Sequence, residues 1–350
     1  MLLSVVWRGG GRDYAIANSL FTTTPDLTKW IALPASKIET GFDEEALELV
    51  KSHGGEVQRF EEREIASIAG FKLSLAISHT LSSKNGMEPE IDLSGKMRLK
   101  TIAATAKPLS EHFEYHLRLT TLLSIICWRN ISFEKMLVQR EIDDGDATDK
   151  PSWASMPKPL ISTRFDPWEP PKANKPYLLS FDDIGESGLA TWFSLMADYS
   201  SPLRQISYIA KMRKSLTLEN QVVLFGIAFE ELGVTILKSQ NRQLSICECI
   251  EGLLGDSFSD RKESAFLFDG ALPKVIANTY SSVKHPKKMR GGRPREEWLR
   301  PDHLRNVVLA CRAFSLIWIA NKLGCREKVV RELELETQFS QALMECSAYA

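Results

Sequence analysis

Residues 271–295 read ALPKVIANTYSSVKHPKKMRGGRPR, and their pattern decides how the second half of the chain is interpreted. Apolar side chains recur at the spacing of a helix with one buried face, and a polar stripe follows the same period opposite. Pro286 ends this predicted helix, because proline breaks helical hydrogen bonding. The buried stripe is Leu272, Val275, Ile276, Thr279 and Val283, and the polar stripe is Lys274, Asn278, Ser281 with Ser282, and His285.

A basic loop follows this predicted helix. Between residues 284 and 295 there are six basic residues and no acidic one, namely Lys284, Lys287, Lys288, Arg290, Arg293 and Arg295. A helix that ends in a histidine and continues into such a loop suits a phosphodiester ligand. Two simpler interpretations stay open. His285 could be a cation that caps the negative end of the helix, and the loop could be a solvated surface.

Length and charge narrow the class of protein. The 350 residues, 43% of them hydrophobic, are enough for one full core and allow two. The net charge of −1 hides an asymmetry, since residues 261–350 carry 16 Lys and Arg against 10 Asp and Glu. This end therefore has a charge of +6 and the remainder −7, so an anionic partner is expected at the basic end.

The six cysteines form no CxxC pair and no zinc-type spacing. Free thiols are therefore expected, and no bound metal or cofactor is expected. Cys247 and Cys249 leave a redox or metal pair as the alternative. The N-terminus lacks the features of a signal peptide. The apolar run 307–323 contains Arg312 and Asn321 and is predicted to be a buried helix, not a membrane span. A cytoplasmic protein without a membrane partner is expected.

The first part of the chain favours strands. Runs at 71–78 and 91–102 have strand character, with turn signals at Asn85-Gly86 and Ser94-Gly95, and a helix is predicted at 43–53. Residues 108–126 predict another helix and 133–138 another strand. His112 and His116 are four residues apart on that helix and could hold a metal. Without a third ligand, a packing or surface role is favoured.

Helices dominate after residue 205. Residues 141–175 are acidic and rich in Ser and Pro, which predicts a long loop or arm docked by Trp153 and Trp168. Short helices at 189–196 and 203–212 follow. Five longer ones are then predicted at 218–236, 243–254 (ended by Gly255), 271–285, 301–323 and 327–344. The fold class is therefore α+β, with a β-rich domain over 1–200 and an all-α bundle over 205–350.

This layout resembles the ApeA-like proteins, in which an ApeA-type N-terminal domain precedes a helical HEPN domain. The segments that carry the resemblance in the first part are PLSEHFEYHLRLTTLLSIICWRN and FEKMLVQ. In the second part they are ENQVVLFGIAFEELG, IANTYSSVKHP and RNVVLACRAFSLIWIANKLG. Together they extend over most of the chain from about residue 70 to 330.

The resemblance implies a metal-independent ribonuclease that dimerises and acts in abortive defence against bacteriophage. Such domains pair an arginine with a histidine at RxxxxH-like spacing, and His285 matches the histidine. The arginine is missing, because the positions that could hold it are Tyr280, Thr279 and Asn278. Asn278 keeps a polar group on that face.

Two functions follow as expectations. In the first, His285 is the general base and acid of a ribonuclease, Asn278 and Lys284 assist it, and the N-terminal domain gates it in response to a phage-derived or host trigger. The RNA, tRNA included, would be bound by the basic side chains of Lys274, Lys287, Lys288, Arg290, Arg293 and Arg295. In the second, the helical domain has lost catalysis and binds RNA, nucleotide or a protein partner. A homodimer is also expected, formed through the helical domain with the two copies of helix 271–285 facing each other.

Overall fold

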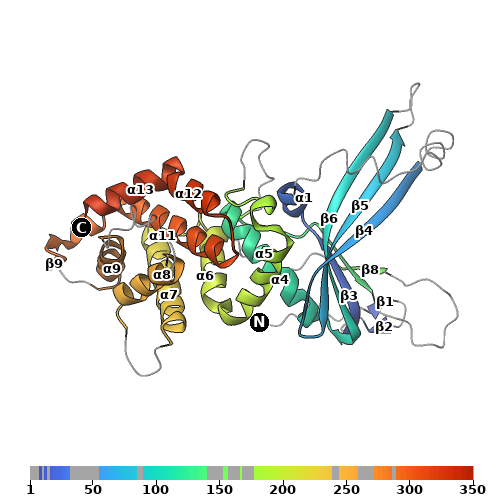
Figure 1. The fold of residues 1–350 in the computed structure, drawn as a ribbon, viewed down its shortest axis with the longest axis horizontal. Helices are drawn as coiled ribbons and strands as arrows, with labels where there is room; N and C mark the ends of the chain where they lie inside the picture. The colour runs from blue at the N-terminus through green and yellow to red at the C-terminus, as the bar shows by residue number, and fades with distance from the viewer. Residues whose placement is uncertain are drawn as a thin grey trace.

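The computed structural model places an antiparallel sheet at one end of the molecule and a group of helices at the other (Figure 1). It describes residues 8–9, 12–13, 16–31, 55–84, 90–139, 153–156, 166–167, 177–238, 244–258, 271–285 and 289–349. The strands of the main sheet precede residue 157, and the long helices from residue 181 follow. The α+β class predicted from the sequence is confirmed.

The main sheet has six strands in the order β4-β5-β6-β3-β7-β8, and every neighbouring pair is antiparallel. β4, at one edge, carries the exposed residues Glu61, Glu62, Arg63 and Glu64, and a charged edge discourages pairing with another sheet. The strands are β3 Ile16–Thr23, β4 Gly55–Ile68, β5 Phe71–Lys84, β6 Glu90–Pro108, β7 Lys135–Gln139 and β8 Trp153–Met156. β1 Arg8–Gly9 and β2 Arg12–Asp13 form a separate pair.

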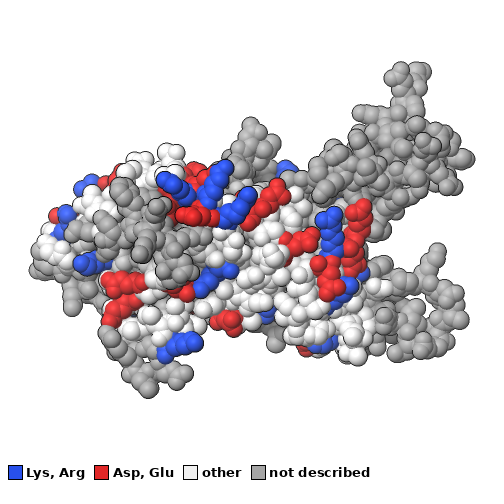
Figure 2. Space-filling view, in the orientation of Figure 1, with Lys and Arg blue, Asp and Glu red and all other residues white. Residues whose placement is uncertain are grey.

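One face of the sheet is covered by helices. Leu73, Leu75 and Leu99 point to this face and are almost fully buried, as alternation along a strand requires. α4 Leu109–Cys127 packs against β3 and β6, and α1 Pro25–Ile31 lies against β6. The opposite face carries charged pairs such as Lys100 with Glu62, whose Nζ and Oε2 are 2.6 Å apart. On the side shown in Figure 2, basic and acidic side chains lie next to one another over the sheet and the helices.

A buried hydrogen-bonded chain fixes α4 to the sheet. His112 Nε2 lies 3.0 Å from the carbonyl oxygen of Ala17, which only accepts, so this nitrogen carries the proton. The bare Nδ1 of His112, 2.9 Å from Thr101 Oγ1, accepts the hydroxyl proton of Thr101. Thr101 Oγ1 in turn accepts from His116 Nε2 at 3.0 Å, and His116 Nδ1 accepts from the Thr22 hydroxyl. Of the packing or surface role favoured for both histidines, the structure shows packing, because both are fully buried.

Burial keeps these two imidazoles neutral. It lowers the pKa of His112, and it lowers the pKa of His116 to about 3, with the neighbouring His112 adding to the effect. Among the described residues, no three His, Cys, Asp or Glu side chains gather as they would around a metal ion.

The helical part is built around α11 Pro301–Lys322, which contacts α7, α8, α9, α12 and α13. α11 is the one helix among the described residues that is long and apolar enough to cross a membrane, and 78% of its apolar window is buried inside the protein. The prediction of a buried helix over 307–323 is confirmed. The other long helices are α5 Phe181–Asp198, α6 Ser200–Lys211, α7 Leu218–Ile236, α8 Ile246–Phe258, α9 Ala271–Lys284, α12 Glu327–Leu335 and α13 Thr337–Ala348.

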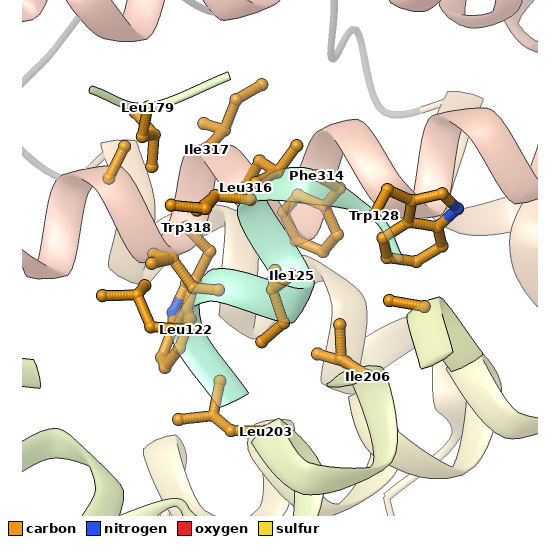
Figure 3. Close-up of a cluster of buried hydrophobic side chains, with 14 of the residues drawn as sticks. Leu122, Ile125, Trp128, Leu179, Leu203, Ile206, Phe314, Leu316, Ile317 and Trp318 are labelled. Carbon is orange, nitrogen blue, oxygen red and sulfur yellow. The ribbon is translucent and has the colours of Figure 1, made fainter. Parts of the chain in front are cut away.

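One hydrophobic core continues across the predicted boundary near residue 200. Figure 3 shows Leu122 and Ile125 of α4 close to Leu203 and Ile206 of α6 and to side chains of α11. Trp128, the residue after α4, stacks on Phe225 of α7 with ring centres 5.9 Å apart and an interplanar angle of 6°. The division into domains 1–200 and 205–350 stays a prediction, and its two sides share a buried aromatic contact.

Three sequence predictions are wrong in detail. Ser94-Gly95 is not a turn, because both residues pair with β5 inside the continuous strand β6. Gly255 does not end its helix, since α8 continues to Phe258 and packing against α7 and α9 outweighs a glycine cost of about 1 kcal/mol. The predicted helix 327–344 is two helices, because Glu336 leaves the helical conformation at φ −53° and ψ 122°.

Other predictions need extension or lie outside the described residues. The helix expected at 189–196 lies in α5, which is interrupted by a kink at Gly185 (φ 68°, ψ −179°), and Ser180 caps the turn before this kink with a capping box to Asp183. The helix at 43–53, the Asn85-Gly86 turn and most of the segment 141–175, Trp168 included, lie outside the described residues. Trp153 is in β8, where only the backbone is described.

Candidate functional site

α9 presents the buried stripe that its sequence predicts. Leu272, Val275, Ile276 and Thr279 are buried at 1% exposure or less, and Val283 is half-buried. Tyr280 adds to this face, where its ring approaches Gly226 of α7 so closely that a Cβ there would stand 2.3 Å from a ring carbon. α9 thus packs directly on the backbone of α7, which fixes its position.

Ser282 does not belong to the exposed polar stripe. It is 1% exposed, and its hydroxyl is buried without a hydrogen-bond partner. The reason is the chain that follows, because α10 Arg295–Trp298 folds back against this side of α9. Local periodicity contains no information about a later segment that covers the helix.

The β9–β10 hairpin makes this return possible. β9 Met289–Arg290 pairs with β10 Arg293–Pro294, and the two residues between them are glycines with φ of 53° and 74°. Two positive φ angles in a two-residue connection are typical of a type I′ turn, which glycine adopts without strain. Gly291 lies against α9, where a Cβ would stand 2.5 Å from Asn278 Nδ2. Asn278 therefore faces the hairpin.

His285 is exposed at the C-terminal end of α9. Its backbone nitrogen donates to Ser281 O at 2.9 Å, which continues the helical pattern by one residue. Seven residues separate His285 from Asn278, so at 1.5 Å per residue they lie roughly 10 Å apart along the helix. The Cα atoms of Asn278 and His285, which are predicted to act together, are therefore two helical turns apart within one copy of α9.

An arginine reaches the same helix end from beyond the hairpin. Arg295 Nε donates to Ser282 O at 2.9 Å, and Ser282 O is the carbonyl next to the one that His285 N uses. A guanidinium at this place also suits the negative end of the helix dipole. The half-buried Arg295 is thus held within one turn of His285. Among the basic side chains after α9 that the structure describes, Arg295 bonds to a carbonyl of α9 and Arg293 to Glu297.

Lys284, the residue before His285, is held by two successive side-chain hydrogen bonds that lead to Glu230 of α7. Its Nζ donates to Tyr280 Oη at 2.8 Å, and the Tyr280 hydroxyl donates to Glu230 Oε2 at 3.2 Å. The bond to Tyr280 raises the pKa of Lys284, so the ammonium stays charged, while burial raises the pKa of Tyr280. Lys284 is therefore a positioned charge.

Arg293 is committed to neighbours inside the protein. Its Nη1 lies 3.3 Å from Glu297 Oε2, and its guanidinium carbon lies 4.7 Å from the centre of the Tyr349 ring. Tyr349 also packs on the buried His303, with ring centres 4.1 Å apart, and on Trp298 at 5.7 Å. The side chains of Arg293, Trp298, His303 and Tyr349 form a compact group beside α9.

His303 joins that group to α9. The Thr279 hydroxyl donates to Val275 O at 2.8 Å, so its oxygen, 2.9 Å from His303 Nε2, accepts the imidazole proton. Burial lowers the pKa of His303 to about 4, and the ring is neutral at physiological pH.

The remaining predicted residues lie apart or outside. Lys274 is exposed on the first turn of α9, ten residues before Lys284, and its nearest neighbourhood includes Cys247 of α8. Lys287 and Lys288 lie outside the described residues, as does the side chain of Arg290. All six cysteines are free thiols.

Sequence reasoning missed Glu230, His303 and Tyr349. Tyr280 and Lys284 could have been paired, because residues four apart on a helix face each other. Nothing local marks Glu230, 50 residues earlier, or Tyr349, 46 residues after His303. Only the packing of α7, α11 and α13 around α9 brings them together.

Comparison with known proteins identifies the first part of the chain. The model of the family described as ApeA N-terminal domain 1 matches residues 5–192, more than half of the 350 residues. The matched region includes the six-stranded sheet and α4, and it ends within α5. No curated protein and no solved structure matches the chain. The chain therefore belongs to the family of proteins that carry ApeA N-terminal domain 1.

Proposed function

We propose that this protein is an ApeA-like anti-phage effector whose helical part is a HEPN-type domain that cleaves RNA at the end of α9. The observation that carries the proposal is that the Nε of Arg295 and the backbone nitrogen of His285 bond to consecutive carbonyls of α9, at 2.9 Å each, so both residues lie at the same end of the helix. An imidazole and a guanidinium carried at one helix end are the two groups that RNA cleavage through the 2′-hydroxyl needs.

The chemistry assigns proton transfer to the imidazole and charge stabilisation to the cations. His285 accepts the proton of a 2′-hydroxyl while the 2′ oxygen forms a bond to the adjacent phosphorus. The bond from phosphorus to the 5′ oxygen then breaks, and the imidazolium returns the proton to that oxygen. The products are a 2′,3′-cyclic phosphate and a 5′-hydroxyl. The guanidinium of Arg295, with the ammonium of Lys284, offsets the negative charge that develops on the phosphoryl oxygens.

Arg295 accounts for the missing arginine of the family pattern. Asn278, Thr279 and Tyr280 leave α9 itself without one, and Tyr280 is instead committed to Glu230 and Lys284. The hairpin after α9 supplies a guanidinium from the far side of Gly291-Gly292. In this proposal the catalytic pair is His285 and Arg295, and Asn278 has a structural role under the hairpin.

The assembly and its control are part of the same proposal. Two copies related by a two-fold axis would place their α9 ends together and enclose a phosphodiester that one exposed histidine cannot surround. The sheet-bearing N-terminal part would sense the phage-derived or host trigger. The buried contact between Trp128 and Phe225 would be a route from α4 to α7, since it joins the two parts directly.

Purified full-length protein tests this pair. Wild type, Arg295→Lys and His285→Ala are incubated with single-stranded RNA and with tRNA in the presence of EDTA. Arg295→Lys keeps the charge but loses the Nε bond to Ser282 O, so cleavage should fall about 100-fold, the effect of removing one transition-state donor. Unchanged cleavage in Arg295→Lys would contradict the role of Arg295. Wild type that binds RNA but leaves it intact would select the second candidate, a binding module without catalysis.

A further inference from the structure

Tyr349 occupies a cage whose walls have the chemistry of a nucleobase site. The ring lies 4.1 Å from the imidazole of His303, centre to centre, and the two planes are tilted by only 30°. The indole of Trp298 packs edge-on to it, and the guanidinium of Arg293 lies 4.7 Å from the ring centre. Aromatic faces and arginine are the groups on which proteins stack the bases of single-stranded RNA.

The walls of the cage are rigid. Trp298 is 1% exposed and His303 3% exposed, and the latter is fixed by its bond to Thr279 of α9. Gly291 in the hairpin approaches Trp298 Cζ2, where a Cβ would stand 3.3 Å away. These contacts come from α9, α10, α11 and the hairpin, so the walls are held by contacts that do not involve Tyr349.

The occupant is held more weakly than the walls. Tyr349 directly follows α13, and it is half-buried. Its hydroxyl reaches the carbonyl of Glu297 only at 3.4 Å, so the ring is held chiefly by stacking and by the Arg293 cation. A rotation of this side chain empties the cage and leaves the buried residues of α13, Cys346 included, in place.

The cage also lies at a useful distance from the proposed cleavage site. Thr279, which holds His303, precedes His285 by six residues, or roughly 9 Å along α9. Arg293 lies in β10 and Arg295 directly follows that strand. The Arg293 side chain lies over the Tyr349 ring in the cage, and the Arg295 side chain bonds to Ser282 O near His285. An RNA strand that follows these two arginines would pass from the cage to the histidine.

We propose that Arg293, Trp298 and His303 form a stacking site for one base of single-stranded RNA, and that Tyr349 closes it as an internal mimic of that base. The inference rests on the proposed function, because the bound strand is the one that His285 would cleave. It adds an autoinhibitory contact, since RNA must displace the Tyr349 ring before it reaches the site in full. Removing the ring should therefore tighten RNA binding.

The experiment measures affinity with a fluorescent single-stranded RNA ten nucleotides long, carrying 2′-O-methyl groups so that it cannot be cleaved. Full-length wild type, Tyr349→Ala, Tyr349→Phe and the double variant Tyr349→Ala/Trp298→Ala are compared. Tyr349→Ala should bind at least about fivefold more tightly, the lower limit for stacking of one base. Tyr349→Phe keeps the ring in the cage and should match wild type, and the double variant should lose the gain.

A second probe separates stacking from charge. Emptying the cage also releases Arg293, which could attract phosphates alone. A strand of the same length and charge with abasic positions has no base to stack, so Tyr349→Ala should not bind it more tightly than wild type does. An equal gain on the abasic strand, or no gain on the normal strand, would overturn the inference.

The outcomes also distinguish this inference from the proposed function. RNA cleavage that depends on His285, without any effect of Tyr349→Ala on affinity, would refute the cage and leave the nuclease. A base-dependent gain in Tyr349→Ala without cleavage by any variant would support the cage and refute the nuclease. RNA binding by neither wild type nor Tyr349→Ala would refute both.

Discussion

The Thr101 hydroxyl is the centre of the buried chain that joins α4 to the sheet, and its removal gives a prediction with a defined magnitude. It donates to His112 Nδ1 at 2.9 Å and accepts from His116 Nε2 at 3.0 Å, and all three residues have 0% exposure. In Thr101→Val a methyl group of similar size replaces the hydroxyl. One bare imidazole nitrogen and one N–H are then buried without partners.

The expected loss of stability follows from those two groups. Each buried polar group without a partner costs about 1–3 kcal/mol, so the pair costs roughly 2–6 kcal/mol. The additional methyl group returns about 1 kcal/mol of hydrophobic stabilisation. Thr101→Val should therefore lower the free energy of unfolding by about 1–5 kcal/mol. The matched control is Thr101→Ser, which keeps the hydroxyl and loses one methyl group, at about 1 kcal/mol.

Urea unfolding at pH 7.5, followed by far-ultraviolet circular dichroism, compares the free energies of unfolding of the two variants with wild type. Equal slopes in urea show that the unfolded and folded states remain comparable. Thr101→Val should unfold at the lower urea concentration. If Thr101→Val proves as stable as wild type, the hydroxyl does not link the two histidines and the proton assignment along the chain is wrong.

Three further outcomes are expected. As the pH falls from 6.5 to 5, the free energy of unfolding should decrease by up to about 1.4 kcal/mol per pH unit for each of His112, His116 and His303. The reason is that burial lowers the pKa of these three side chains in the folded protein, so the unfolded chain binds more protons. Urea titrations at several pH values that show no such decrease would contradict this. Gly226→Ala would place a Cβ 2.3 Å from the Tyr280 ring and should lower the free energy of unfolding by about 1–3 kcal/mol. The control Gly255→Ala meets nothing within 4 Å and should be neutral or stabilising. Calorimetry that finds Gly226→Ala the more stable variant would refute the packing of α9 on α7. Light scattering at micromolar concentration should return a dimer for full-length protein, and a monomer would refute the proposed two-fold assembly.

The fold class and the helical faces could be predicted because they depend on local patterns. The buried stripe of Leu272, Val275, Ile276 and Thr279 is a property of fourteen consecutive residues, and the structure confirms it. The buried helix over 307–323 was equally clear, since Arg312 and Asn321 exclude a lipid-facing span. The resemblance to the ApeA-type N-terminal domain is confirmed by the match over residues 5–192.

The details of the candidate site depend on contacts between distant segments, which periodicity does not contain. Ser282 looked exposed because the segment that covers it begins thirteen residues later with Arg295. Arg295 looked like one of several cations in a loop until the turn at Gly291-Gly292 brought it to the Ser282 carbonyl. His303 and Tyr349 meet through the packing of α11 against α13, and no short motif joins them.

The central claim is that His285 cleaves RNA, and RNA integrity in cells tests it most directly. Wild type and His285→Ala are expressed at equal levels in bacteria, with and without phage infection, and total RNA is sequenced for fragments that end in a 2′,3′-cyclic phosphate. The account predicts such fragments, and arrested growth, in infected cells with wild type, and neither in cells with His285→Ala. Since His285 is exposed, its replacement should leave folding unchanged. Identical fragments in both strains, or intact RNA in both, would contradict the assignment of His285.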